Sequence, residues 1–235
     1  MKKSKLLYEG KAKKLYETDD PDLIIIEFKD HATALDGKKK GVIKDKGIVN
    51  NKISAYIFNF LNSYHIPTHF EKELSDREML VKRLQMIPVE IIVRNIATGS
   101  LCTKYGCKEG EDLQYPILEF YLKNDELNDP MMNEYHAAAF GLATPEEMKT
   151  LVRYATKINA IFKSFFIRRK VRLVDFKLEF GRFHDVLYLG DEISPDTCRF
   201  WDLDTGEELE KDRFRKDMGQ VEEAYQEMLR RVLKL

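Results

Sequence analysis

The stretch LVDFKLEFG, residues 173–181, alternates charged and apolar side chains without interruption. Asp175, Lys177 and Glu179 lie two residues apart, and apolar residues occupy the positions between and beside them. Because the side chains of a strand point alternately to its two faces, this pattern predicts a strand with one charged and one apolar face. Such alternation is typical of antiparallel sheets with one solvated face, so the pattern alone favours a solvated surface over a binding site.

The order of the other predicted elements indicates an α+β fold with mainly antiparallel sheets. KLLYEG, KAKKLYET and DLIIIEF predict strands in the first third of the chain, and MLVKRLQ with PVEIIVRNIA predicts a further strand pair. Apolar residues at helical spacing predict a helix over 49–64, a longer one that begins after the N-cap candidate Thr144, and a C-terminal helix. Strands come in adjacent pairs rather than in a βαβ repeat. A break at 84–88 suggests two lobes, 1–85 and 86–235.

Composition and charge limit the classes of function. The 235 residues include 39 basic and 40 acidic side chains, so the formal net charge is −1, and we expect no nucleic-acid partner and no membrane partner. No apolar run is long enough to span a bilayer, and the three cysteines lack paired zinc-ligand spacing. A reduced, cytoplasmic setting is therefore expected. Any anion binding must come from local clusters of basic residues.

The motif YEGKAKKLY, residues 8–16, is the first candidate anion site. Gly10 lies between two predicted strands, where backbone N–H groups are free to approach an anion. Lys11 and Lys13 are two residues apart, so we expect both ammonium groups on one side of the second strand. The motif is not a P-loop, and a hairpin with solvated lysines is an equally good interpretation.

Two downstream carboxylates could form a metal site. The run from DFKLEFG through RFHD into VLYLGDE predicts a hairpin that brings Glu179 near Asp191, with both beside Lys177. Carboxylate oxygens are ligands that Mg²⁺ takes, usually together with substrate phosphates. The alternative is a cross-strand network of salt bridges. Glycine and proline in GDEISPD favour a strand end that presents its side chains.

Two other basic motifs are suited to phosphate binding. In EIIVRNIATGS, Arg94 ends a predicted strand and Ser100 follows in a turn, and a guanidinium with hydroxyls and free amides suits a phosphate monoester. Lys211 and Arg215 lie one helical turn apart in KDRFRKDMG, although Arg215 could be an ordinary surface residue. The charged segment 122–134 is by default a solvated loop. Together these sites suggest an enzyme that uses a nucleotide and a second phosphorylated substrate.

Seven motifs, in order from residue 8 to about 219, resemble the signature blocks of the SAICAR synthetase family: YEGKAKKLY, KGIVNNKIS, VEIIVRNIATGS, LKNDELNDP, LVDFKLEFG, GDEISPDTCRFWD and KDRFRKDMG. These ligases use ATP to join L-aspartate to the carboxylate of carboxyaminoimidazole ribotide (CAIR) in purine biosynthesis. The resemblance implies a two-lobed fold related to ATP-grasp enzymes and distantly to protein kinases, with ATP between the lobes. It also implies a homodimer of the bacterial type, without a fused carboxylase domain.

The resemblance also implies roles for individual residues. Those expected at the ATP are Gly10, Lys11, Ala12, Lys13 and Lys123 around the phosphates and Val81, Lys82, Leu84 and Met86 at the adenine. Glu179 and Asp191 would hold the Mg²⁺ of the nucleotide. Those expected at CAIR are Arg94, Ser100 and Arg199 for its phosphate, and Glu90, Asp129, Asp175 and Lys177 around the imidazole, its carboxylate and an associated Mg²⁺. Asp36, Lys211 and Arg215 would lie at the CAIR and aspartate end.

The implied chemistry makes the charged face of 173–181 a site rather than a solvated surface. Phosphoryl transfer from ATP would turn the CAIR carboxylate into a carbonyl phosphate, which the amine of L-aspartate then attacks. This step needs charge neutralisation and positioning, for which lysines such as Lys177 and Lys123 and Mg²⁺ are suited. Asp175 or Asp36 would accept the proton of the amine, and the mobile 36–47 loop with the glycine hairpin would exclude water. A small-molecule kinase of related fold and a nucleotide-binding or RNA-binding module are the alternatives.

Overall fold

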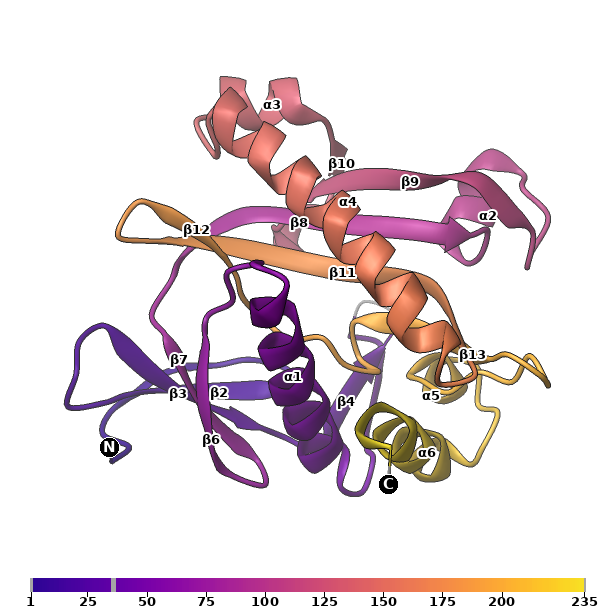
Figure 1. The fold of residues 1–235 in the computed structure, drawn as a ribbon, viewed down its shortest axis with the longest axis horizontal. Coiled ribbons are helices and arrows are strands. Elements are labelled where there is room, and N and C mark those ends of the chain that lie inside the picture. The colour runs from indigo at the N-terminus through magenta and orange to yellow at the C-terminus, as the bar shows by residue number, and fades with distance from the viewer. Residues whose placement is uncertain (1, 35–36, 235) are drawn as a thin grey trace.

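The computed structural model describes residues 2–34 and 37–234, which form two large antiparallel sheets with helices packed against them (Figure 1). The prediction of an α+β fold with mainly antiparallel sheets is confirmed. Within the described ranges, no helix combines the length and the apolarity needed to cross a bilayer. Asp36, one of the predicted site residues, lies outside the described residues.

The first sheet has the strand order β1-β2-β3-β7-β6. Its strands are β1 (Leu6–Glu9), β2 (Lys13–Glu17), β3 (Leu23–Phe28), β6 (Phe70–Ser75) and β7 (Glu78–Lys82). Gly10 lies in the turn between β1 and β2, as expected. Lys11 also lies in this turn rather than on β2, so the prediction that Lys11 and Lys13 share a face of the second strand is wrong. A short hairpin of β4 (His31–Ala34) and β5 (Lys39–Val42) follows the first three strands in the chain.

The second sheet has the order β10-β9-β8-β11-β12, and β13 pairs with β11 as well. Its strands are β8 (Gln85–Ile96), β9 (Asp112–Leu122), β10 (Met131–Met132), β11 (Val171–Phe183), β12 (Val186–Leu189) and β13 (Cys198–Asp202). The motif LVDFKLEFG forms most of β11, the central strand. Its register sets Asp175 opposite Arg94 on one side and opposite Arg199 on the other, and Glu179 opposite Glu90.

The strands β7 and β8 exist as predicted, but they do not pair with each other. β7 belongs to the first sheet and β8 to the second. Neither of the linking residues, Arg83 and Leu84, is a turn-forming type, and the chain crosses from one sheet to the other instead of reversing. A parallel bridge between Thr68 and Leu189 joins the sheets again.

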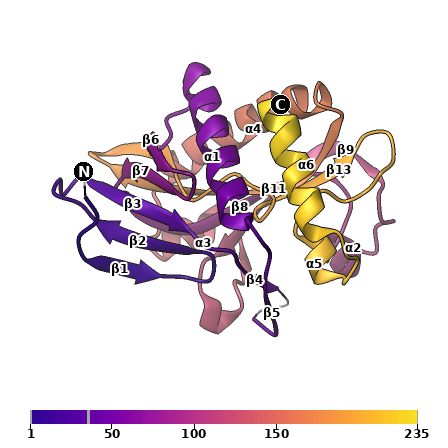
Figure 2. The same ribbon diagram turned by 90° about the horizontal axis from the view of Figure 1, so that it is seen from below.

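Three long helices complete the fold: α1 (Lys46–Ser63), α4 (Pro145–Ile167) and α6 (Val221–Leu233). The expected start of α4 is confirmed, because the Thr144 hydroxyl accepts a hydrogen bond from the Glu147 N–H and the Glu147 carboxylate accepts one from the Thr144 N–H. α4 crosses the second sheet, and Figure 2 shows α6 beside α1. The shorter helices are α2 (Ser100–Tyr105), the 3₁₀ turn η1 (Asp125–Leu127), α3 (Glu134–Ala139) and α5 (Asp212–Arg215).

One continuous cluster of buried apolar side chains extends from the first sheet through α1 and α4 to the second sheet. The chain crosses between the sheets at residues 83–84, but the expected break at 84–88 is wrong for residues 85–88, which belong to strand β8. Because the core is shared, the division into 1–85 and 86–235 stays a prediction. Both sheets contribute residues to one cleft.

Candidate active site

A cleft of about 460 Å³ opens where the β1–β2 hairpin faces strand β11 and the loop that follows β12. Its lining combines apolar side chains, including Leu15, Ile24 and Met86, with many charged side chains. The lining residues are Tyr8, Gly10, Lys11, Ala12, Lys13, Leu15, Ile24, Ile26, His69, Lys82, Leu84, Met86, Glu90, Lys123, Asp125, Asp129, Lys177, Glu179, Asp191, Glu192, Asp196, Thr197 and Lys211. Such a mixture suits a ligand with one apolar and one anionic end.

Lysines and carboxylates alternate at the centre of the cleft. Lys177 Nζ lies 3.3 Å from Glu90 Oε1 and 3.3 Å from Asp191 Oδ2, and it also contacts Glu179. The prediction that Glu179 and Asp191 both lie next to Lys177 is thus confirmed. Lys13 Nζ contacts Asp191 and lies 3.0 Å from Glu192 Oε1. Lys123 contacts Glu179 from the other side.

The electrostatics of this cluster keep its central ion pairs charged. Burial alone would raise the pKa of Asp191, but the ammonium groups of Lys13 and Lys177 outweigh burial and hold that pKa well below its usual range. Burial likewise opposes the charge of Lys177, yet Asp191, Glu179 and Glu90 raise its pKa well above the ordinary value. Glu90 differs, because burial and the neighbouring Glu179 raise its pKa even though Lys177 acts against them. An added cation beside Glu90 would oppose this rise and favour its ionised form.

A second charged cluster lies further along the same face of β11. Arg94, which is only 2% exposed, donates through Nε to Glu119 (2.7 Å), through Nη1 to Asp175 (3.1 Å) and through Nη2 to the Ser100 hydroxyl (3.0 Å). Arg199 donates through Nη1 to the same Asp175 oxygen (2.7 Å). The sheet register thus brings together two guanidinium groups from β8 and β13.

The turn before α2 needs the glycine at position 99. Gly99 has a φ of +56°, and a Cβ there would lie 3.1 Å from Nη2 of Arg199. A side chain would strain the backbone and crowd the guanidinium. The ATGS turn therefore brings its backbone close to the arginine cluster, as a phosphate site requires.

Most predicted site residues line the cleft or belong to the arginine cluster. Fourteen of them line the cleft: Gly10, Lys11, Ala12, Lys13, Lys82, Leu84, Met86, Glu90, Lys123, Asp129, Lys177, Glu179, Asp191 and Lys211. Arg94, Ser100, Asp175 and Arg199 form the arginine cluster, and Arg215 joins it through Asp212, which also accepts a hydrogen bond from Arg199. Val81 is the exception among the adenine residues, because its side chain is fully buried in the core and does not line the cleft.

The described part of the 36–47 segment, residues 37–47, differs from the mobile surface loop that its glycines and lysines predict. Residues 39–42 form β5, and Lys39 Nζ lies 2.6 Å from Asp217 Oδ1 and contacts the Phe214 carbonyl oxygen of α5. Lys46 at the start of α1 is completely buried. Tertiary contacts that the local sequence does not show hold this segment.

Sequence reasoning also missed several residues of the cleft. His69 is buried there, and burial lowers its pKa to about 3, so it is neutral at physiological pH. Glu192, Asp196 and Thr197 follow Asp191 in the motif GDEISPDT. Two acidic residues within five positions of a predicted metal ligand were the available signal.

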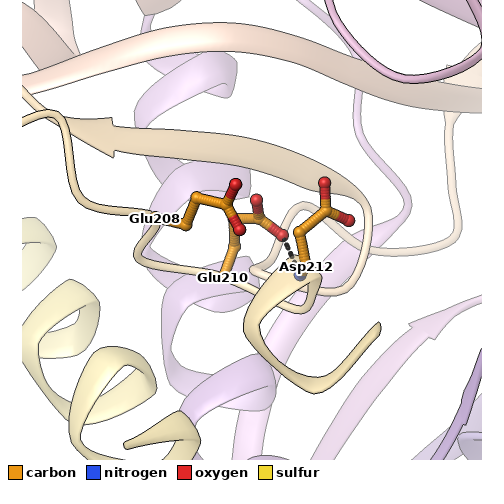
Figure 3. Close-up of side chains that lie close together, drawn as sticks. All are labelled: Glu208, Glu210 and Asp212. Atoms are coloured by element: carbon orange, nitrogen blue, oxygen red, sulfur yellow. Dashed lines mark hydrogen bonds between the residues drawn. The ribbon is translucent and has the colours of Figure 1, made fainter. Parts of the chain in front are cut away.

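Glu208, Glu210 and Asp212 form an acidic group (Figure 3), which Asp212 connects to Arg199 of the arginine cluster. Glu210 Oε2 accepts a hydrogen bond from the Asp212 N–H (2.6 Å), and Asp212 binds Arg199 and Arg215. Burial and the charge of Asp212 raise the pKa of Glu210 well above its usual value. The guanidinium groups of Arg199 and Arg215 already neutralise the charge of Asp212. The acidic group therefore holds these arginines in place and is a poor metal site.

Comparison with known proteins assigns the chain to a family. The SAICAR synthetase family matches residues 6–232. The phosphoribosylaminoimidazole-succinocarboxamide synthase of Prosthecochloris aestuarii is 60% identical over 235 residues, which are 100% of both chains. The crystal structure of the synthase of the same name from Ehrlichia chaffeensis has a TM-score of 0.96 at 42% identity and covers 98% of this chain and 99% of its own. A SAICAR synthetase (Type-2) in complex with ADP has a TM-score of 0.94 at 46% identity, with 97% of each chain covered. This chain therefore belongs to the SAICAR synthetase family.

Proposed function

We propose that this cleft joins the CAIR carboxylate to the amine of L-aspartate in an ATP-dependent ligation that yields SAICAR, ADP and phosphate. The observation that carries the proposal is the arrangement on β11. Lys177 lies among Glu90, Glu179 and Asp191, and Asp175 on the same face binds two arginines. A strand rises about 3.3 Å per residue, so the two clusters are about 7–13 Å apart, a separation on the scale of a ribotide.

The nucleotide would bind at the end of the cleft that the β1–β2 hairpin covers. Leu15, Ile24 and Met86 offer apolar contacts for a base, and backbone groups near Gly10 with Lys11 and Lys13 suit the phosphates. Lys123 reaches the same region from the segment after β9.

The donor set fits Mg²⁺. Glu179, Asp191, Glu90 and Asp129 are carboxylates that line one cleft, and oxygen ligands of this kind suit a hard divalent ion shared with phosphate groups. When bound, Mg²⁺ would neutralise charge on the transferred phosphoryl group.

CAIR would bind with its phosphate at Arg94, Arg199 and Ser100. Bidentate guanidinium groups and a hydroxyl are suited to a phosphate monoester. Its carboxylate would then lie near Lys177, where phosphoryl transfer from ATP gives the carbonyl phosphate. Lys177 and Lys123 would compensate the charge of this step. Orientation of the two reactants can contribute roughly 7–11 kcal/mol to lowering the barrier.

The amine of L-aspartate would attack the carbonyl carbon, and phosphate would leave. A proton must leave the amine, and Asp175 and Asp36 were the expected acceptors. Asp175 Oδ2 already accepts hydrogen bonds from both arginines, which favours a role in holding the phosphate site over one in proton transfer. Asp36 remains the candidate acceptor.

The test is a coupled assay with purified protein, ATP, Mg²⁺, CAIR and L-aspartate, in which ADP and SAICAR are both quantified. The ligase predicts one SAICAR for each ADP, with formation abolished by EDTA. Stable phosphorylation of CAIR without L-aspartate would support the kinase alternative. ATP binding without hydrolysis in the complete mixture would support the binding-module alternative. We also propose a homodimer, which light scattering after gel filtration would test.

A further inference from the structure

A groove outside the cleft lies between the end of α1, the C-terminal half of α4 and the end of α6. Its volume is about 470 Å³, which is within the range of small-molecule sites. None of its lining residues lines the cleft or has a part in the reaction described so far. Aromatic and basic side chains are prominent in the lining: Phe60, Tyr64, Phe165, Arg168, Arg169 and Lys234.

The aromatic side chains of the groove lie close together. The ring centroid of Phe60 is 4.7 Å from that of Phe165 and 5.0 Å from that of Tyr64. Lys157 Nζ donates to the Tyr64 carbonyl oxygen at 2.7 Å and so holds the end of α1 against α4. Tyr64 is 43% exposed, which leaves part of its ring free to contact a ligand.

The two arginines of the groove are held by the ends of helices. Arg168 donates to the Ser164 carbonyl oxygen (3.0 Å) and to the Ser164 hydroxyl (2.5 Å). Arg169 donates to the carbonyl oxygens of Phe165 and Val232, both at 3.2 Å. Cations are stabilised there because the last carbonyl groups of a helix carry partial negative charge. A guanidinium has five N–H donors, so these bonds orient the arginines and leave donors for a ligand.

The groove has an excess of positive charge. Residues 46–70 and 148–174 contain no aspartate or glutamate, although the formal net charge of the whole chain is −1. Within the described residues, no carboxylate forms an ion pair with Arg168 or Arg169. Burial lowers the pKa of Arg169, and the nearby charge of Arg168 acts in the same direction. A bound anion would oppose both effects.

Aromatic rings beside guanidinium groups are complementary to a ligand that has a planar ring system and a phosphate group. Aromatic side chains stack on the faces of bases, and guanidinium groups bind phosphate oxygens in pairs. Basic surfaces with aromatic side chains also bind single-stranded nucleic acid, but they do so along an extended track. The limited volume of this groove favours a small ligand.

We propose that this groove is a second binding site, for a small phosphorylated aromatic compound of the nucleoside monophosphate class. Tyr64 and Phe60 would contact the ring system, and Arg168 with Lys234 would bind the phosphate. The site is separate from the cleft, so this inference goes beyond the proposed ligase function and does not rest on it.

The test is isothermal titration calorimetry with AMP as the probe, and with adenosine and inorganic phosphate as its two halves. Saturating ADP, Mg²⁺ and CAIR are present and L-aspartate is absent, so that the cleft is occupied under the proposed function. The variants are Arg168→Met and Tyr64→Ala. Arg153→Met, on the exposed face of α4, and Tyr115→Ala, at an exposed tyrosine of β9, are the matched controls, since neither residue lines the groove.

We expect AMP to bind the wild type and both controls with Kd values within about twofold of one another. Hydrogen bonds to charged groups have strengths that correspond to roughly 10-fold to 100-fold in Kd, and we expect Arg168→Met to weaken AMP binding by that factor. Stacking on an aromatic ring corresponds to about 5-fold to 150-fold, which is the expectation for Tyr64→Ala. The affinity for phosphate should fall only in Arg168→Met, and the affinity for adenosine only in Tyr64→Ala.

Three outcomes would overturn the inference. The first is no binding of AMP to the wild type at concentrations up to about 5 mM. The second is an unchanged Kd for AMP in both Arg168→Met and Tyr64→Ala. The third is a single-stranded RNA octamer that binds far more tightly than AMP and loses its affinity in Arg168→Met, which would assign the groove to nucleic acid.

Circular dichroism checks the fold of each variant. If Arg168→Met does not fold, Lys234→Met replaces it, because the exposed Lys234 lies beyond the last turn of α6 and should weaken phosphate binding in the same way. The comparison between variants holds whether or not the protein forms SAICAR, so failure of the proposed function and failure of this inference are distinguishable.

Discussion

Replacement of Arg94 by methionine should destabilise the protein strongly. The Arg94 side chain is 2% exposed, and its guanidinium binds Glu119, Asp175 and Ser100. Without Arg94, Asp175 keeps its hydrogen bond from Arg199. Glu119, whose side chain is 6% exposed, keeps only the hydrogen bond from the Tyr121 hydroxyl (3.0 Å). The variant therefore leaves a buried carboxylate without its cation.

Removal of one partner of a buried ion pair typically costs about 3–5 kcal/mol of the free energy of unfolding. For a chain of this size, 1 kcal/mol corresponds to about 2–4 °C in Tm, so we expect Tm to fall by about 6–20 °C. Arg199→Met is the matched comparison, because Arg199 is 21% exposed and its partners Asp175 and Asp212 keep Arg94 and Arg215. Its loss of stability should be clearly smaller, about 1–2 kcal/mol.

Urea denaturation followed by circular dichroism measures both effects at pH 7. A rescue is also expected, because Glu119→Gln in the Arg94→Met background removes the unpaired charge and should restore part of the lost stability. Both arginine variants should lose CAIR binding under the proposed function. A stability of Arg94→Met within 1 kcal/mol of the wild type, or a Glu119→Gln change that adds a further loss, would refute the argument.

Three further predictions concern other parts of the molecule. The hydrogen bond from Arg182 is the chief cause that lowers the pKa of Glu147 to about 2, so the stabilisation by its carboxylate is present above pH 4.5 and is lost as the pH falls towards 2. The difference in unfolding free energy between wild type and Glu147→Gln, roughly 1–2 kcal/mol, should therefore shrink over that range. The exposed Glu146→Gln variant should show little difference from wild type at any pH. Gly47→Ala would place a Cβ 2.5 Å from the Phe28 carbonyl oxygen and should cost about 1–3 kcal/mol in thermal unfolding, against no measurable change for the exposed Asn59→Ala on the same helix. Asp191→Asn and Lys177→Ala should abolish SAICAR formation while circular dichroism shows an intact fold; an active, folded double variant would contradict the site assignment.

Local patterns were sufficient to predict most elements. The capping sequence predicted the start of α4 at Thr144, and its apolar stripe predicted the buried face. Seven residues of that stripe are buried: Met148, Leu151, Ala155, Ile158, Phe162, Phe165 and Phe166. Val152 is exposed because the stripe is broader than the face that packs on the sheet. The alternation in LVDFKLEFG likewise predicted the strand and its two faces. These successes share one cause, since side-chain periodicity records which face of an element is buried.

Contacts between distant segments could not be read in this way. The pairing of β7 and β8 was wrong because strand propensity does not specify a partner. The buried state of Lys46 depends on Asp196, which lies 150 positions away in the chain. A lysine in a glycine-rich segment ordinarily indicates a solvated loop. Only the ion pair with Asp196, which forms in the folded protein, accounts for the burial of Lys46.

Residues 173–181 could not show by themselves whether their charged face is solvated, because that also depends on distant segments. Lys177 and Glu179 have the same alternation in either case, and the difference comes from Lys13, Glu90, Lys123 and Asp191, which other elements bring over them. Each lysine–carboxylate pair in this cluster combines a group that suits phosphate with a group that suits Mg²⁺. Binding of a magnesium nucleotide would therefore exchange partners within the cluster instead of leaving any charge unpaired. In a partly buried cleft, such a cluster compensates its own charges and can still bind both phosphate and Mg²⁺. The salt bridges of a solvated face need no such compensation, because water already stabilises their charges.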